Sequence, residues 1–209
     1  MLGNVNVLLF CLAAWALILT PGPDMIYVIT RGIGQGRSAG LLSAAGVTSG
    51  ILVHTLLAAL GIAVVLQTSE LAFMLVKYLG AFYLIYLGVK TILARGQLAL
   101  GQTNAPIRKQ ALYSQGLLSN VFNPKVALFF WAFLPQFIVG EPSSITLPLI
   151  GLGLIFALFT FTFLSLVGYF SGHIGVWLNE RPGINANMRW ITGSVMIGLG
   201  VRLALTKRV

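Results

Sequence analysis

The stretch ILTPGPDMIYVIT, residues 18–30, interrupts an apolar run and decides how the rest of the chain is interpreted. It follows VNVLLFCLAAWAL, residues 5–17, so hydropathy alone predicts a helix that crosses a membrane. Four consecutive residues disturb that helix: Pro21, Gly22, Pro23 and Asp24. The prolines have no backbone N–H, so the carbonyls of Leu17 and Leu19 lose their helical donors. Asp24 adds a charge that costs roughly 2.5–3.5 kcal/mol at the centre of a membrane helix.

Composition places the chain among membrane proteins. Of its 209 residues, 57% are hydrophobic and 8% are charged, and the mean hydropathy is +0.93. A soluble domain carries about 25% charged residues. The net charge of +9 comes from basic residues dispersed between apolar runs, which does not form the basic face of a nucleic-acid-binding protein. Cys11 is the single cysteine, so no intrachain disulfide is expected.

Six segments are long enough, or nearly so, to cross a bilayer, which takes about 20 residues. We predict spans at residues 5–30, 40–66, 71–93, 111–139, 145–170 and 190–205. The connections between them are short and rich in Gly, Pro, Ser or charge. None of them is long enough for a separate domain, so residues 1–209 are predicted to form one all-α transmembrane domain.

The distribution of Lys and Arg predicts the orientation in the membrane. The first, third and fifth connections, with the ends of the neighbouring spans, carry eight basic residues: Arg31, Arg37, Lys90, Arg95, Arg108, Lys109, Arg181 and Arg189. The opposite side carries four: Lys77, Arg202, Lys207 and Arg208. Because basic residues concentrate in cytoplasmic loops, both termini are predicted to lie outside the cytoplasm.

The chain also contains an internal repeat. Residues 77–94 align without gaps against residues 189–206, and the TPGPD break has a counterpart in VFNPKVAL, residues 121–128. In this alignment Pro23 matches Pro124, and Asp24 matches Lys125. Repeats of about 1–95 and 111–209 each contain three crossings, so the second copy must be inverted. Inverted repeats with interrupted helices at matching positions point to the binding site of a secondary transporter.

Four motifs together resemble the lysine-exporter/homoserine-threonine-resistance (LysE/RhtB) family. They are LTPGPD (residues 19–24), GVTSGILVHTLLAALG (46–61), KYLGAFYLIYLGVK (77–90) and NPKVALFFWAFLPQF (123–137). The resemblance extends over nearly the whole chain in the expected order. It implies a six-helix exporter of amino acids or close derivatives in the bacterial inner membrane, and not an enzyme. No motif names the substrate.

An interrupted helix suits a zwitterionic substrate, because it offers free N–H groups at one half-helix and free carbonyls at the other. Pro124 removes the helical donor of the Asn120 carbonyl, as the first two prolines do for Leu17 and Leu19. The predicted substrate site therefore comprises Pro21, Gly22, Pro23, Asp24, Asn120, Asn123, Pro124 and Lys125. The alternative is that the prolines only kink packed helices, with Ser119 or Asn123 capping the gap.

Export against a gradient needs an energy source. The sequence contains no Gly-Lys-Ser/Thr phosphate loop, so no nucleotide or other cofactor is expected, and a proton gradient is the predicted source. Asp24 is the one carboxylate within a predicted span. We expect Asp24 to carry the proton and, when it is charged, to pair with Lys125. Protonation of Asp24 would break this pair and release Lys125 to the substrate carboxylate; a static ion pair is the alternative. His54 is the second candidate for proton coupling.

Two other functions fit parts of the sequence. A serine hydrolase would use Ser49 with His54 or His173, but Ser49 and His54 are five positions apart and point to different helix faces. A metal-ion transporter of similar helical plan remains the alternative function, although a divalent cation prefers several carboxylates. Helix faces rich in Gly and Ala also permit a homodimer.

Overall fold

The computed structural model describes residues 6–62, 70–93, 108–138, 145–173 and 182–205, which contain helices and no strand. The first half holds α1 (Val7–Leu19), α2 (Pro23–Gln35), α3 (Arg37–Leu57), the π-helical turn η1 (Ala58–Ile62) and α5 (Glu70–Leu93). The second half holds α6 (Lys109–Val121), α7 (Pro124–Leu128), η2 (Phe129–Phe133), η3 (Leu134–Phe137), α8 (Thr146–Tyr169) and α10 (Pro182–Leu205).

Two of the predicted helices are broken, each at its proline motif. The axis bends by 51° between α1 and α2, and by 48° between α6 and the segment that begins with α7. Pro23 and Pro124 each occupy the first turn of the following half-helix. A proline is tolerated there because the N–H that it lacks would have no helical partner. The breaks expected near residues 21–24 and 120–125 are thus present.

Membrane-spanning length is confirmed for only part of the six-helix prediction. Arg37–Gly61 and Thr146–Tyr169 are each long and apolar enough to cross a bilayer, and each bent pair qualifies if it is one span. The described residues therefore contain between two and four candidate spans by length and composition. The six-span arrangement remains a proposal, to which α5 and α10 would contribute the other two crossings.

Two of the connections between helices are shorter than predicted. Residues 31–39 were expected to form a loop, but α2 continues to Gln35 and α3 begins at Arg37. Gly36 alone makes the turn, with a φ of 85° that favours glycine over any residue with a Cβ. The last connection is also shorter than predicted, since α10 begins at Pro182 and not at residue 190.

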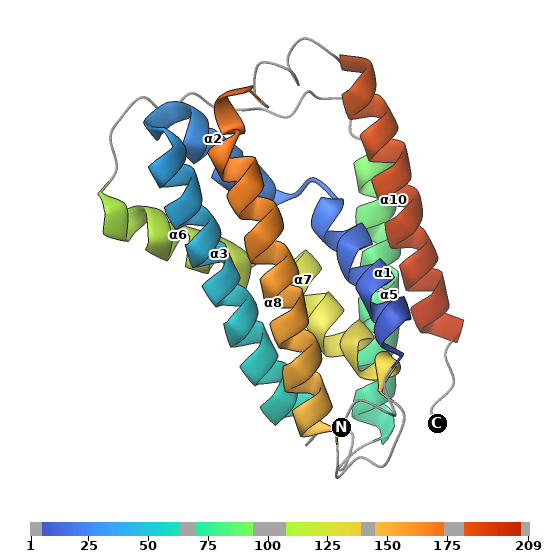
Figure 1. Ribbon diagram of the computed structural model, residues 1–209. Coiled ribbons are helices and arrows are strands. Elements are labelled where there is room, and N and C mark those ends of the chain that lie inside the picture. The colour runs from blue at the N-terminus through green and yellow to red at the C-terminus, as the bar shows by residue number, and fades with distance from the viewer. Residues whose placement is uncertain (1–5, 63–69, 94–107, 139–144, 174–181, 206–209) are drawn as a thin grey trace.

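Close glycine contacts hold α3 between α6 and α8 (Figure 1). A Cβ at Gly40 would lie 2.6 Å from the carbonyl oxygen of Gly168 on α8, and one at Gly46 would clash with the carbonyl oxygen of Tyr113 on α6. Small residues let helix backbones approach in this way, which is how helices associate in lipid. α3 is therefore fixed against both of its neighbours by backbone contact.

α5 and α10 form a second pair, side by side in Figure 1. A Cβ at Gly88 would lie 2.6 Å from the carbonyl oxygen of Gly193, and one at Gly200 would lie 2.8 Å from that of Ala81. The two helices are therefore antiparallel. In the alignment of residues 77–94 with 189–206, Gly88 matches Gly200 and Ala81 matches Gly193, so the two contacts are equivalent to each other.

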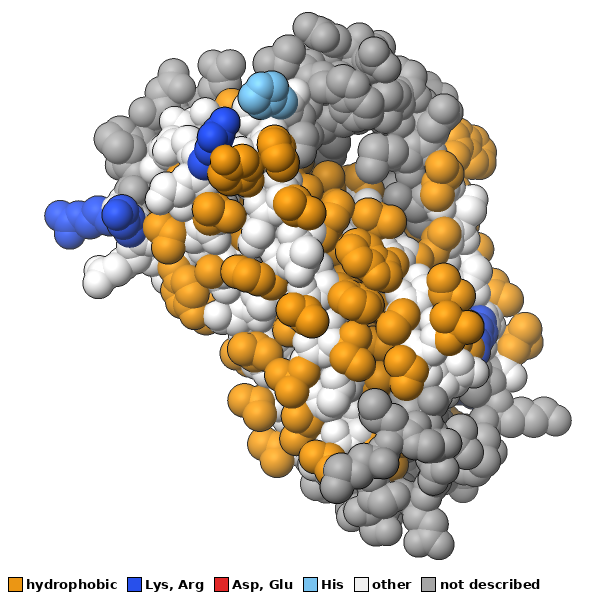
Figure 2. Space-filling view, viewed as in Figure 1, with side chains coloured by type: hydrophobic (Ala, Val, Ile, Leu, Met, Phe, Trp, Pro, Cys, Tyr) orange, Lys and Arg blue, Asp and Glu red, His pale blue; other side chains and the backbone are white. Residues whose placement is uncertain are grey.

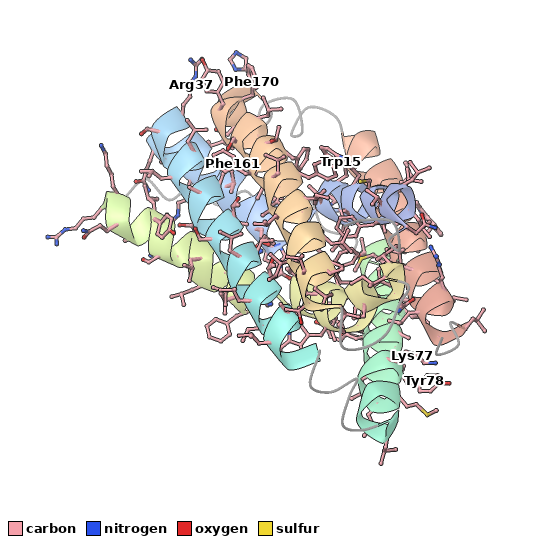
Figure 3. All side chains as sticks on the ribbon, turned by 60° about the horizontal axis from the view of Figure 1, so that its bottom comes forward. Trp15, Arg37, Lys77, Tyr78, Phe161 and Phe170 are labelled. Carbon is pink, nitrogen blue, oxygen red and sulfur yellow. The ribbon has the colours of Figure 1, made fainter. Side chains whose placement is uncertain are left out.

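Phenylalanine side chains fill the core beside the second break: Phe10, Phe129, Phe130, Phe133, Phe137 and Phe156. Hydrophobic side chains also cover the middle of the face formed by α3 and α8, whereas Lys and Arg lie toward its edges (Figure 2). Arg37 and Phe170 lie at one end of the bundle, and Lys77 and Tyr78 lie at the other (Figure 3). An apolar belt between charged ends is the surface that a bilayer requires.

Candidate functional site

The first break exposes the carboxyl-terminal end of α1, and a lysine from the other half of the chain binds there. The Lys125 ammonium donates to the carbonyl oxygens of Leu17 and Thr20, at 3.1 and 3.0 Å. The carboxyl-terminal end of a helix carries partial negative charge, so a cation is stabilised at this position. Gly22 keeps the approach open, since a Cβ there would lie 3.2 Å from Nζ of Lys125.

The second break supplies side-chain donors to the carboxylate of Asp24. Oδ2 of Asp24 accepts from the amides of Asn120 and Asn123, both at 2.8 Å, and Oδ1 accepts from the hydroxyl of Ser119 at 3.2 Å. Asp24 also lies in the first turn of α2, where the positive end of the helix dipole favours an anion. The carboxylate is therefore stabilised by both broken helices.

The expected ion pair between Asp24 and Lys125 is not formed among the described residues. Each group instead binds neutral partners in the other half of the chain: backbone carbonyls for the ammonium, and amides and a hydroxyl for the carboxylate. The physical reason is that both breaks offer polar groups without helical partners, and such groups must be satisfied where they are buried. The matched charges do lie at one site, but they stabilise it separately.

Asn120 connects the Asp24 carboxylate to His54. Nε2 of His54 lies 3.1 Å from the carbonyl oxygen of Asn120, the group that Pro124 was predicted to free. Nδ1 of His54 and Oδ1 of Asn120 are buried and have no hydrogen-bond partner among the described residues. Gly50 makes room for this arrangement, because a Cβ there would lie 2.6 Å from Oδ1 of Asn120.

A cavity opens beside the two breaks. The space inside it that no atom fills is about 360 Å³, counting its open mouth. Its polar wall consists of Thr20, Asp24, Asn120, Lys125 and Thr160, and its apolar wall includes Met25, Ile51, Phe156 and Leu164. A carboxylate, an ammonium group and an apolar surface therefore face one small volume.

The structure brings the predicted residues of both breaks together. Asp24, Asn120 and Lys125 line the cavity. Asn123 donates to Asp24 and caps α7 by accepting from the backbone N–H of Lys125 at 3.1 Å. Pro21, Gly22, Pro23 and Pro124 shape the turns. His54 approaches this group through Asn120 and is not part of the cavity wall.

Three contributors were absent from the predicted site. Ser119 was considered only as a cap, and it instead donates to Asp24. Thr20 contributes its backbone carbonyl to Lys125, and its position directly before Pro21 is the signal that identifies it. Thr160 lines the cavity from α8, outside both breaks, where no motif marks it.

The alternative chemistries find little support in these contacts. Ser49 accepts a hydrogen bond from the Tyr113 hydroxyl at 2.6 Å and donates to the Ala45 carbonyl, whereas His54 contacts Asn120. Ser49 and His54 therefore do not form a nucleophile–base pair. Within the described residues, no group of three or more His, Cys, Asp or Glu side chains is placed to hold a metal ion.

Comparison with known proteins identifies the family. The model of the LysE type translocator family matches residues 15–207. A leucine efflux protein of Salmonella choleraesuis is 30% identical, with 97% of this chain and 96% of that protein covered. A leucine efflux protein of Klebsiella pneumoniae is 31% identical over the same shares. An uncharacterized membrane protein of Bacillus subtilis, YrhP, is 30% identical, with 96% and 99% covered. No solved structure matches.

The chain therefore belongs to the LysE type translocator family. The resemblance carried by the four sequence motifs is confirmed. Together with the leucine efflux relatives, the family supports an amino-acid exporter. The apolar helices and the membrane-protein relatives agree with a membrane location.

Proposed function

We propose that this LysE type translocator exports an amino acid with an apolar side chain from the cytoplasm across the bacterial inner membrane. The observation that carries the proposal is the cavity in which Asp24, Lys125 and an apolar wall face the same space. Such a wall suits a leucine-like side chain, and two of the relatives are named leucine efflux proteins. Leucine is therefore the first substrate to test.

The charged groups retain capacity for a zwitterion. The ammonium of Lys125 has three N–H donors and uses two of them on Leu17 and Thr20, which leaves one for a substrate carboxylate. Within the described residues, Oδ1 of Asp24 accepts from Ser119 alone, and a carboxylate oxygen can accept two hydrogen bonds. The substrate ammonium would bind on the Asp24 side and the substrate carboxylate on the Lys125 side.

The proposed architecture is six spans in two inverted three-helix repeats, with both termini outside the cytoplasm. The equivalent contacts of Gly88 and Gly200 between antiparallel helices support it, as do the two breaks at matching prolines. An even number of crossings places both termini on one side, and α1 begins toward the same end of the bundle at which α10 finishes (Figure 1). In this arrangement, the site lies where the two repeats meet, as in other transporters built from inverted repeats.

Proton antiport is the proposed energy source. Asp24 would take up a proton from the outside as the substrate leaves there, and it would release this proton to the cytoplasm before the next substrate binds. Its contacts support this role, because protonation weakens its acceptance of three hydrogen bonds that join α2 to the second break. The exchange would therefore loosen the contact between the repeats. His54 would assist through Asn120.

Purified protein in liposomes loaded with radiolabelled amino acids tests the function. Leucine, isoleucine and methionine should leave these liposomes faster than they leave protein-free liposomes. A pH gradient with the acidic side outside should increase the rate. Lysine and glutamate serve as charged controls, for which the apolar wall offers no partner. If the protein increases the efflux of none of these amino acids, the proposal is contradicted.

A further inference from the structure

The hydroxyl of Thr160 is a buried polar group for which the helix provides no partner. Thr160 lies on α8 and lines the cavity, yet only 5% of its surface is exposed. Its Oγ1 has no hydrogen-bond partner among the described residues. Leaving a buried hydroxyl unpaired is costly, and this one lies on the wall of the cavity, where a ligand would complete the bond.

Other threonines in the same bundle show the usual solution. The hydroxyls of Thr20, Thr48, Thr55 and Thr162 each donate to the carbonyl four residues earlier, at 2.7 to 2.9 Å. Thr162 does so only two positions further along α8, where it binds the Leu158 carbonyl. The corresponding bond from Thr160 to the Phe156 carbonyl is not made. The free hydroxyl is therefore a property of this position and not of threonine in an apolar helix.

The neighbours of Thr160 fix the direction of its helix face. Phe156 and Leu164 lie one turn before and one turn after it, and both line the same cavity. Residues four apart share a helix face, so α8 presents an apolar side chain, a hydroxyl and a second apolar side chain to the cavity. On the other walls, the polar groups belong to the two breaks.

We propose that the Thr160 hydroxyl donates a hydrogen bond to the carboxylate of the transported amino acid. This inference rests on the proposed function and adds a substrate contact from α8 to it. A carboxylate accepts several hydrogen bonds, and Lys125 has one N–H left to give. The Thr160 hydroxyl is a further donor on the cavity wall, and no group in the described part of the chain uses it. The ammonium, in contrast, has acceptors in Asp24 and in the unpaired Oδ1 of Asn120.

Thr160→Val tests the contact, because it replaces the hydroxyl by a methyl group of similar size. A hydrogen bond to a charged group contributes about 1.5–3 kcal/mol, so the KM for leucine should rise about tenfold or more. The maximal rate should change by less than about threefold, since the hydrogen bond serves binding. Thr160→Ser retains the hydroxyl and should restore the wild-type KM. At one leucine concentration, the Tm of purified wild-type and Thr160→Ser protein should likewise rise more than that of Thr160→Val.

Thr162→Val is the matched control on the same helix, and it should leave the KM unchanged. If Thr160→Val does not accumulate in the membrane, Thr160→Ala replaces it in the same comparison. A wild-type KM in the variant without the hydroxyl, or an equal loss in Thr160→Ser, overturns the inference while the proposed function stands. Wild-type protein that neither transports nor binds any amino acid of the panel overturns both.

Discussion

The two broken helices carry matching prolines, but they contribute different chemistry to the site. The first break, between α1 and α2, offers backbone carbonyls, and these bind a cation. The second break, between α6 and α7, offers the side-chain donors Ser119, Asn120 and Asn123, and these bind an anion. The first break has no side-chain cap at Gly22, whereas Asn123 caps the second.

The difference shows that both charges belong to the first break. Asp24 lies at the start of α2, and Lys125 extends from α7 to the end of α1. Lys125 lies in the first turn of its own half-helix, where the dipole disfavours a cation, so its position is explained by the helix end that it reaches. The two breaks have similar sequences, but the site that they form is asymmetric. Both charged groups lie at the first break: Asp24 at the start of α2, and the Lys125 ammonium at the end of α1.

Lys125→Met should break this arrangement most severely. The substitution removes the lysine donor from the carbonyls of Leu17 and Thr20, of which Leu17 keeps the backbone N–H of Thr20. It also removes the cation that would meet the substrate carboxylate. A loss of about 3 kcal/mol in binding corresponds to a fall of at least about a hundredfold in leucine transport at low concentration. The rate is measured in proteoliposomes at matched protein content.

Lys90→Met is the control for the loss of a lysine charge. Lys90 is exposed on α5 and lies 5.8 Å from the ring centroid of Tyr86, away from both breaks. Its replacement should leave transport within about twofold of wild type, because exposed charges contribute little. Equal losses in the two variants would mean that net charge, and not the first break, controls transport.

Asp24→Asn should separate energy coupling from substrate movement. The amide cannot exchange a proton as a carboxyl does, so the stimulation of efflux by an acidic exterior should disappear. Leucine exchange without a pH gradient should persist, since an oxygen acceptor remains at this position. Parallel measurements of gradient-driven efflux and of counterflow in the same proteoliposomes check the expectation. Undiminished stimulation by the gradient would exclude Asp24 as the proton carrier and make His54 the next residue to replace.

Gly50→Ala should reduce transport least among the three site variants. It tests whether the second break needs Asn120 in its observed position. The new Cβ would lie 2.6 Å from Oδ1 and 2.7 Å from Cβ of Asn120, so Asn120 must shift from the position in which it donates to Asp24. Transport should fall about threefold to tenfold, in line with the loss of one hydrogen bond to a charged group.

Gly151→Ala on α8 is the matched control, because nothing lies within 4 Å of its added Cβ. Alanine is also the better helix former, so this variant should transport normally and have an equal or higher Tm. If Gly50→Ala transports as well as Gly151→Ala, Asn120 is not required in its observed position.

Sequence reasoning locates the breaks because proline acts locally. Pro23 and Pro124 interrupt helical hydrogen bonding whatever surrounds them, and both half-helices begin at these residues. The partners of the two charges depend instead on how distant helices pack. The pairing of Asp24 with Lys125 was the simplest expectation for two opposite charges, but it ignored the unpaired backbone and amide groups that each break also presents.

Other features have no distinct sequence signal. Thr160 and Thr162 stand two positions apart in the same apolar stretch, and only the fold shows that one hydroxyl is bonded to its helix and the other is not. Gly36 resembles any glycine of its connection until its φ of 85° identifies it as the turn. The substrate depends on the shape of the cavity, which no single residue determines.

The contacts of Asp24 also determine the order in which the chain can mature. Its partners Ser119, Asn120 and Asn123 follow it by 95 to 99 positions. At a synthesis rate of roughly 5–20 residues per second, they leave the ribosome about 5–20 s after Asp24 does. During that interval, the first half has a carboxylate without these partners, and the carbonyls of Leu17 and Thr20 have no lysine. The contacts between the two breaks can therefore form only after the second break has been synthesised.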